Sequence, residues 1–271
     1  MPRVAVLQMT SGIDPEANLR VIEDAARDAA ADGAAMLFAP EMAVLLDRNR
    51  DRAEPHIQNA AVRCWGERLT SLAVEHGVDL VVGSPYPGEG GRNRNRLWYA
   101  SADGDPARFY DKMHMFDVDL ASGESWRESN AYHAGNKVVV IDKTPVGRLG
   151  LTICYDIRFP ALFDALGRQG CDVIAIPAAF TVPTGKAHWH TLVTARAIEA
   201  SAFVIAAAQV GRHEDGRETY GHSLVVDPWG DVLLDMKGEE AGLGFADIDL
   251  DRIAEARAQV PSLANRRSIP N

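Results

Sequence analysis

The sequence predicts an α/β fold in which mixed β-sheets are covered on the outside by helices. Two observations support this expectation. Short apolar runs of strand length recur along the whole chain, and most of them are rich in Val and Ile. Helix-like stretches separate these runs around residues 1–85 and 150–210, whereas the regions 95–153 and 220–250 contain strands without helices. Sheets that combine parallel and antiparallel pairs follow from this mixture.

The predicted strands are defined by the apolar runs themselves. In chain order they are Val4–Met9, Ala34–Ala39, Leu80–Gly83, Val138–Ile141, Leu149–Ile153, Val173–Ile176, Phe203–Ala208, Leu224–Val226 and Leu243–Ile248. Hairpin turns are expected at Asp103-Gly104 and at Asp227-Pro228-Trp229-Gly230, because these residue types favour tight turns.

The clearest predicted helix starts at Asp14-Pro15, an N-cap acid followed by a proline at the first helical position, and stops at Gly33. Its apolar positions repeat with helical spacing, so one face should be buried. The other expected helices are Gln58–His76, Pro160–Gly170 and Ala187–Ser201.

Composition limits the classes of function. The chain has 271 residues, with 28 Lys and Arg against 38 Asp and Glu, which gives a net charge of −10. This acidic balance argues against a broad surface for nucleic acid or anionic membrane. Without an internal repeat or a linker-like segment, we expect a single domain over residues 1–271, with a polar tail from about residue 260.

The cysteines and the apolar segments indicate where the protein works. Cys64, Cys154 and Cys171 are too few for a disulfide framework, which favours a reducing compartment. The N-terminal segment does not resemble a secretory signal, and no apolar run approaches the length of a membrane helix. We therefore expect a soluble, cytoplasmic protein.

Three potentially reactive side chains follow predicted strands. Glu41 follows residues 34–40, Lys112 follows residues 107–111, and Cys154 follows residues 148–153. The end of a strand can hold a polar side chain rigidly at the edge of a sheet, where α/β proteins form ligand sites. We therefore expect the three side chains to meet.

Such a meeting would suit nucleophilic catalysis. Cys154 must be a thiolate to attack, and we expect the ammonium of Lys112 to lower its pKa toward neutrality while Glu41 moves the proton. Backbone N–H groups of the turn could bind an oxyanion. Taken singly, the residues have simpler interpretations: a buried core thiol, a helix N-terminal acid and a solvated lysine.

Three segments resemble the signature blocks of the nitrilase, or carbon–nitrogen hydrolase, superfamily: Phe38–Glu41, Tyr110–Asp117 and Thr152–Pro160. The similarity extends from Val4 to about Val260. It implies Glu41, Lys112 and Cys154 as a catalytic triad, a four-layer αββα sandwich, and homodimers that extend the sandwich.

Further segments resemble the Nit branch of this superfamily: Pro177–Trp189, Ala206–Gly211, Tyr220–Ser223 and Asp227–Gly230. In that branch a second glutamate completes a tetrad, and Glu128 in Ser125-Trp126-Arg127-Glu128 matches it. Glu128 could instead be a surface acid paired with Arg127 or Arg92.

The resemblance implies an amidase that hydrolyses a linear amide of a small carboxylic acid through a thioester, with no metal and no organic cofactor. Deaminated glutathione is the leading expected substrate, ahead of 2-oxoglutaramate and N-carbamoyl amino acids. The alternatives are a catalytically silent scaffold and a cysteine protease with a histidine base.

Four residues are candidates for substrate binding. The backbone N–H of Tyr155 would stabilise the oxyanion. Arg158 could clamp a substrate carboxylate, or it could tie its loop to Asp156. By analogy with the family, Phe180 and Thr181 would line the pocket.

Two other motifs carry weaker signals. His188 and His190 resemble a metal-binding pair, but residues two apart on a helix point in different directions and the sequence places no third ligand with them. Arg92-Asn93-Arg94-Asn95-Arg96 is interpreted as a solvated loop rather than an RNA site, given the net charge.

Overall fold

The computed structural model describes residues 1–62, 64–121, 123 and 125–267. Two six-stranded sheets form its centre. The first has the order β16 (Gly242–Asp247), β1 (Arg3–Gln8), β2 (Met36–Phe38), β3 (Asp79–Tyr86), β4 (Arg94–Ala100) and β5 (Arg108–Asp111). The second has the order β15 (Val232–Asp235), β14 (Leu224–Val226), β11 (Phe203–Ala206), β10 (Val173–Ala175), β9 (Gly147–Leu151) and β8 (Val139–Thr144).

Both sheets are mixed, as the sequence predicts. In the first, β1, β2 and β3 are parallel, and β16, β4 and β5 add antiparallel pairs. In the second, β9, β10 and β11 are parallel, and β8, β14 and β15 add antiparallel pairs. Two further pairs lie outside the sheets: β6 (Asp117–Asp119) with β7 (Ser125–Arg127), and β12 (Val210–Arg212) with β13 (Glu218–Tyr220).

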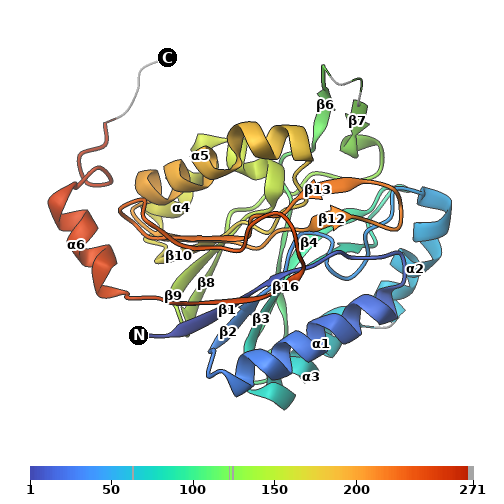
Figure 1. Cartoon of the computed structure of the whole chain (residues 1–271), viewed down its shortest axis with the longest axis horizontal. Helices are drawn as coiled ribbons and strands as arrows, with labels where there is room; N and C mark the ends of the chain where they lie inside the picture. Colours follow the sequence, from blue (N-terminus) through green and yellow to red (C-terminus); the bar gives the residue numbers. More distant parts are fainter. Residues whose placement is uncertain (63, 122, 124, 268–271) are drawn as a thin grey trace.

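Helices cover the outer faces of the two sheets (Figure 1). Helices α1 (Pro15–Ala31) and α3 (Trp65–His76) cover the first sheet, and α4 (Pro160–Arg168) and α5 (Val182–Ala200) cover the second. Alternation along β1 explains the layering: Val4 and Val6 belong to the core between the sheets, while Ala5 and Leu7 pack with the residues of α1 and α3. The expected αββα sandwich is confirmed.

Helix α1 forms as its sequence predicts. The side chain of Asp14 accepts a hydrogen bond of 2.9 Å from the backbone N–H of Glu16, and Pro15 occupies the first turn. Leu19 and Ile22 are fully buried on the inner face. Local capping and the apolar stripe therefore agree with the tertiary packing of this helix.

The helix expected at Gln58–His76 is instead two helices, α2 (Arg50–Val62) and α3, so that prediction is wrong in its extent. Cys64 adopts a left-handed backbone conformation (φ 46°), which ends helical geometry. Packing accounts for the break: Trp65 is buried and a Cβ on Gly66 would lie 3.0 Å from the Trp98 ring.

The remaining predicted elements lie close to their expected positions. Asp103-Gly104 lies between β4 and β5, and Asp227–Gly230 connects β14 to β15, so both predicted turns are confirmed. Helix α6 (Asp251–Gln259) precedes the segment expected to be a polar tail. Among the described residues, no helix is both long and apolar enough to cross a membrane.

Candidate active site

The expected meeting of Glu41, Lys112 and Cys154 occurs between the two sheets. Strands β2 and β5 run in the same direction in the first sheet, so the residues that follow them lie at one edge. Strand β9 delivers Cys154 from the facing sheet. All three residues are buried, with 5%, 2% and 7% of their surfaces exposed, and Lys112 Nζ lies 2.8 Å from Glu41 Oε1.

Glu128 joins this cluster from the short helix η1 (Glu128–Asn130). Its carboxylate accepts hydrogen bonds from Lys112 Nζ at 3.0 and 2.9 Å and from the backbone N–H of Phe116 at 2.6 Å. Neither suggested surface partner holds it: Arg127 pairs with Asp119, and Arg92 donates to the backbone carbonyl of Ser129.

Asn95 is a member of the cluster that the sequence analysis missed. Its side-chain nitrogen donates to Glu41 Oε1 at 2.8 Å and to Glu128 Oε1 at 2.9 Å. The segment 92–96 was interpreted as a solvated loop, and this is wrong, because β4 starts at Arg94 and Asn95 is fully buried. The alternation of Asn and Arg is a strand pattern, which could have revealed that Asn95 faces inward.

Arg96, also in this segment, is buried in a different environment. Its guanidinium lies 3.6 Å from the ring centroid of Phe109 and 4.1 Å from that of Tyr86. It also forms two hydrogen bonds with Asp111, of 2.7 and 3.1 Å. The arginine thus stabilises the β4–β5 pair, from which Asn95 and Lys112 reach the cluster.

A buried carboxylate fixes the turn that carries Cys154. Cys154 has a φ of 48°, and its N–H donates to the carbonyl of Pro177 at 2.9 Å. Asp156 accepts hydrogen bonds from the backbone N–H of Ile153 at 2.9 Å and from the hydroxyl of Tyr110 at 2.7 Å. The unusual backbone at Cys154 is therefore held from both sides.

Electrostatics in the cluster differ from the expectation for the thiol. Burial, together with the charge of Glu41, raises the pKa of Cys154 well above its ordinary value of 9.0, and Lys112 opposes this only in part. The predicted lowering of the thiol pKa is therefore wrong. Burial alone would raise the pKa of Glu41, but the charge and hydrogen bond of Lys112 hold it below its ordinary value.

Lys112 is held as an ammonium ion. Burial alone would lower its pKa, but the carboxylates of Glu128 and Glu41 raise it well above its ordinary value of 10.5. The resting cluster thus combines a neutral thiol with a carboxylate that can take its proton. Glu41 lies close enough to the thiol to raise the pKa of Cys154, so the proton acceptor and its donor are neighbours in the site.

A cavity of about 290 Å³ opens onto the cluster. Its lining contains all the predicted site residues except Arg158, namely Glu41, Lys112, Glu128, Cys154, Tyr155, Phe180 and Thr181. The residues lining this cavity include five acids (Glu41, Asp47, Glu54, Glu128 and Glu218) and five cations (Arg48, Arg50, Lys112, Arg127 and Arg217). The lining is thus electrically balanced in a chain whose net charge is −10.

Arg158 lies beside the cavity rather than among its lining residues. Its Nη2 lies 3.3 Å from Nδ1 of His188, and its guanidinium carbon is 5.5 Å from the ring centroid of Phe180. Arg217, which the sequence analysis did not select, does line the cavity and pairs with Asp215 at 2.8 Å.

Comparison with known proteins places this site in a family. The model of the carbon–nitrogen hydrolase family matches residues 3–258. The deaminated glutathione amidase of Synechocystis is 40% identical over 267 residues, which cover 97% of each chain. The human deaminated glutathione amidase is 37% identical, over 98% of this chain and 83% of that protein.

Solved structures agree with this relationship. The NitFhit protein of Caenorhabditis elegans superposes with a TM-score of 0.90 at 35% identity, and this chain covers 65% of that chain's length. An amidase from Nesterenkonia sp. AN1, solved with acrylamide added to its active-site cysteine, has a TM-score of 0.80 at 26% identity, with 96% and 98% of the two chains covered. The resemblance seen in the three sequence blocks is therefore confirmed, and the chain belongs to the carbon–nitrogen hydrolase family.

Proposed function

We propose that the protein is an amidase that hydrolyses deaminated glutathione to 2-oxoglutarate and cysteinylglycine. The observation that carries the chemistry is a buried thiol that shares the lining of one cavity with the hydrogen-bonded Glu41–Lys112–Glu128 cluster, whose charges act on the pKa of Cys154. The substrate assignment rests on full-length relatives that bear the name deaminated glutathione amidase.

In the first half-reaction, Cys154 Sγ forms a bond to the carbon of the substrate amide. Glu41 takes the thiol proton as the bond forms, which the raised pKa of Cys154 requires, because a free thiolate is scarce in the resting site. The ammonium of Lys112 and the backbone N–H of Tyr155 stabilise the negative oxygen of the tetrahedral intermediate. Glu41 returns the proton to the leaving nitrogen, the C–N bond breaks, and a thioester remains.

In the second half-reaction, water attacks the thioester carbon. Glu41 accepts a proton from the water and then protonates the departing sulfur of Cys154, so the acid product leaves and the resting thiol is restored. Glu128 holds Lys112 in place through both steps by accepting two hydrogen bonds from its ammonium group. The two acids beside Lys112 thus have different tasks: Glu41 transfers protons, and Glu128 balances the charge of the ammonium group.

Positive groups near the cavity suit an anionic substrate. Deaminated glutathione carries two carboxylates, and a balanced lining does not repel them as the surface of an acidic chain would. We propose Arg158 as one carboxylate clamp, reached by a rotamer change away from His188, and Arg217 as a second cation at the cavity wall. Phe180 and Thr181 would hold the chain of the substrate.

A panel assay tests the substrate. Release of 2-oxoglutarate from deaminated glutathione and from 2-oxoglutaramate, and release of ammonia from N-carbamoyl amino acids, are measured at matched concentrations. We expect kcat/KM to be highest for deaminated glutathione. Equally slow turnover of all three would contradict this assignment and leave the amidase chemistry intact.

Intact mass tests the chemistry against the two alternatives. Wild-type protein quenched with acid during turnover should show a thioester adduct on Cys154, whereas a silent scaffold would form none; Glu41→Gln should form this adduct far more slowly, because acylation lacks its base. A cysteine protease with a histidine base would keep its activity in Lys112→Ala, whereas the proposed amidase loses it.

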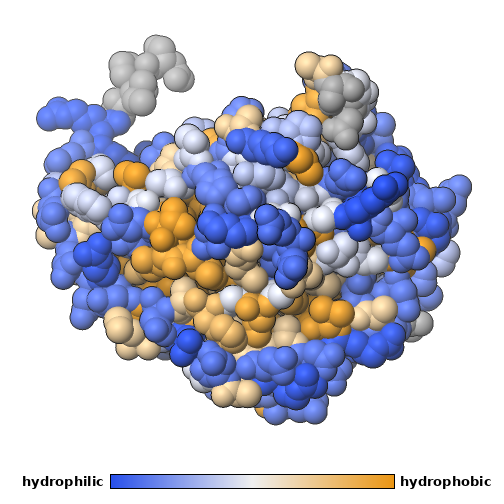
Figure 2. Space-filling view, in the orientation of Figure 1, coloured by the Kyte–Doolittle hydropathy of each residue, from blue (hydrophilic) through white to orange (hydrophobic). Residues whose placement is uncertain are grey.

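We propose that the chain acts as one catalytic domain in a cytoplasmic homodimer. Support for a second copy comes from apolar side chains left in water: Ile198, Trp229, Val232 and Leu233 are 47–49% exposed. Figure 2 shows apolar side chains gathered across the middle of one face, above the hydrophilic surface of α1. Light scattering after size-exclusion chromatography should give twice the chain mass of 29.4 kDa.

A further inference from the structure

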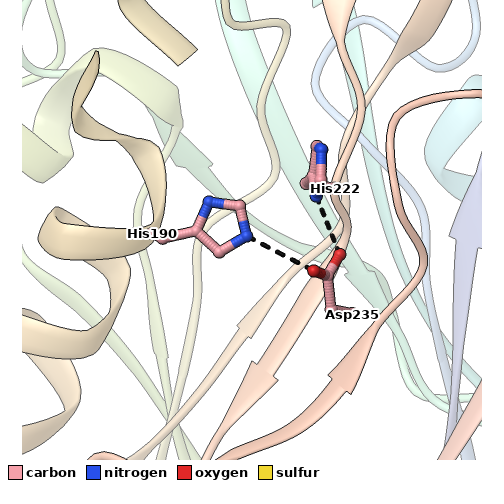
Figure 3. Close-up of side chains that lie close together, drawn as sticks. All are labelled: His190, His222 and Asp235. Carbon is pink, nitrogen blue, oxygen red and sulfur yellow. Dashed lines mark hydrogen bonds and ion pairs between the residues drawn. The ribbon is translucent and has the colours of Figure 1, made fainter. Parts of the chain in front are cut away.

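Two histidines and an aspartate meet at a place that lies outside the catalytic cavity (Figure 3). His190 comes from α5, His222 precedes β14, and Asp235 ends β15. His222 Nδ1 lies 2.9 Å from one carboxylate oxygen of Asp235, and His190 Nε2 lies 3.4 Å from the other. One nitrogen or oxygen atom from each residue lies within 4.8 Å of the corresponding atoms of the other two. None of the three residues lines the catalytic cavity.

The backbone of His222 is held by two hydrogen bonds, and its ring packs against Gly238. Its backbone N–H donates to the carbonyl of Lys237 at 2.7 Å, and its carbonyl accepts from the Trp189 indole at 2.7 Å. These bonds keep the backbone of His222 at a φ of 53°, an uncommon conformation for a residue other than glycine. Gly238 packs against the ring: a Cβ there would lie 3.1 Å from its Cδ2 and Nε2 atoms.

We propose that His190, His222 and Asp235 form a binding site for a divalent transition metal ion of the zinc type. Two imidazole nitrogens and one carboxylate oxygen are donors that Zn²⁺ accepts at about 2.0–2.2 Å, and tetrahedral geometry then separates the donors by roughly 3.4 Å. The two nitrogens lie 2.9 and 3.4 Å from different oxygens of Asp235, and the three donors lie within 4.8 Å of one another, so rotamer changes of the partly exposed side chains can bring them to this spacing. Water completes the coordination, because the side chain of His190 is 41% exposed.

The backbone around Asp235 already supports metal binding. The N–H of Lys237 donates to Asp235 Oδ1 at 2.9 Å, an outer contact of the kind that orients a metal-binding carboxylate. The side chain of Lys237 lies 3.1 Å from Asp235 Oδ2 but is 69% exposed, so a metal ion can displace it into water. Lys237 is therefore a competitor for the site rather than a member of it.

Folding supplies the third ligand that the sequence did not place. His188 and His190 diverge on α5, as their spacing predicts, and His188 is exposed, 3.3 Å from Arg158. His190 instead faces His222 and Asp235. A bound ion would join α5 to the β14–β15 hairpin. Phe180 and Thr181, the residues directly before α5, line the catalytic cavity, so the ion would also fix the wall of that cavity. Metal binding should therefore raise the thermal stability of this wall.

Calorimetric titration of the metal-free protein with Zn²⁺ tests the proposal. The titration uses a Cys154→Ser background, so that the catalytic thiol cannot bind the ion. We expect one site per chain, with affinity reduced at least about tenfold by His190→Ala, by His222→Asn and by Asp235→Asn, since even outer contacts of metal ligands contribute about 10–100-fold. Asparagine is chosen at position 222 because it tolerates a positive φ.

Two control variants make the test specific. His188→Ala, two residues away on the same helix, should leave Zn²⁺ affinity unchanged, and Lys237→Met should increase it by removing the competing cation. With Co²⁺ as the probe, the visible spectrum should show nitrogen and oxygen ligation without a thiolate charge-transfer band. Absence of saturable binding, or binding that survives all three ligand substitutions, would overturn the proposal and leave a hydrogen-bonded triad.

Discussion

The side-chain amide of Asn95 donates a hydrogen bond of 2.8 Å to Glu41, although 54 residues separate them along the chain. The same nitrogen lies 2.9 Å from Glu128. One neutral side chain thus fixes the distance between the two acids that share Lys112. A neutral donor can do this without adding charge to a buried cluster, where each further charge would be costly.

Asn95→Ala should lower kcat about 10- to 100-fold, with a smaller change in KM. The substitution removes two hydrogen bonds to charged groups, each worth about 1.5–3 kcal/mol, and frees Glu41 to move away from Cys154. Steady-state kinetics provide the measurement. Asn93→Ala, two residues earlier in the chain, is the matched control, because Asn93 donates to Glu54 instead; equal losses in both variants would contradict a role specific to Asn95.

Glu128→Gln should lower kcat by about 10²-fold while the protein stays folded. The glutamine keeps the shape and can still accept from the N–H of Phe116, but it removes the charge that holds Lys112. Circular dichroism and kinetics are compared for this variant and for Glu128→Asp, which keeps the charge. Full activity in Glu128→Gln would show that hydrogen bonding alone is sufficient.

Cys154 should make the protein less stable in alkali. Its folded pKa is raised, so the folded state binds the proton more tightly than the unfolded chain, and this contribution is complete below the ordinary pKa of 9.0 and falls as pH rises above it. At pH 10 the loss is about 1.4 kcal/mol.

Urea unfolding at pH 7 and pH 10 measures this effect. The free energy of unfolding of the wild type should fall by about 1.4 kcal/mol more than that of Cys154→Ala over this interval. Each variant is compared with itself, so the different packing of alanine cancels. Equal losses in the two proteins would mean that Cys154 titrates in the folded state as it does in the unfolded chain.

Arg96→Ala should reduce the free energy of unfolding by about 3–5 kcal/mol, because Asp111 would lose its partner in a largely buried position. Lysine should not restore stability, since it lacks the planar group that stacks between Tyr86 and Phe109. The control is Arg94→Ala, which removes a hydrogen bond at the surface and should cost about 1 kcal/mol or less. Urea denaturation distinguishes them.

Substitution of Arg158 and Arg217 separates the two proposed carboxylate contacts. Arg158→Ala and Arg217→Ala should each raise KM for deaminated glutathione about tenfold or more, because a charged hydrogen bond is worth roughly 1.5–3 kcal/mol. An uncharged short-chain amide serves as the control substrate and should show little change. If only Arg217→Ala raises KM, Arg158 keeps to its contact with His188 and is not a clamp.

The sequence by itself determined most elements of the fold and indicated three residues that the structure brings together. Strand-length apolar runs, the Asp14-Pro15 cap and the two turn motifs act locally, so their outcome did not depend on distant residues. Polar residues after strands also indicated Glu41, Lys112 and Cys154, since strand ends are among the few rigid places where a sheet accepts a charge.

Only the tertiary structure decided the electrostatic state of the site and its further members. The pKa of Cys154 depends on how completely the packing of the two sheets buries it, and the role of Asn95 depends on which strand face meets the acids. The Cys64 break and the His190–His222–Asp235 group likewise arise from packing between distant segments. Desolvation and contacts between distant segments arise only when the chain has folded, so local sequence patterns do not predict them.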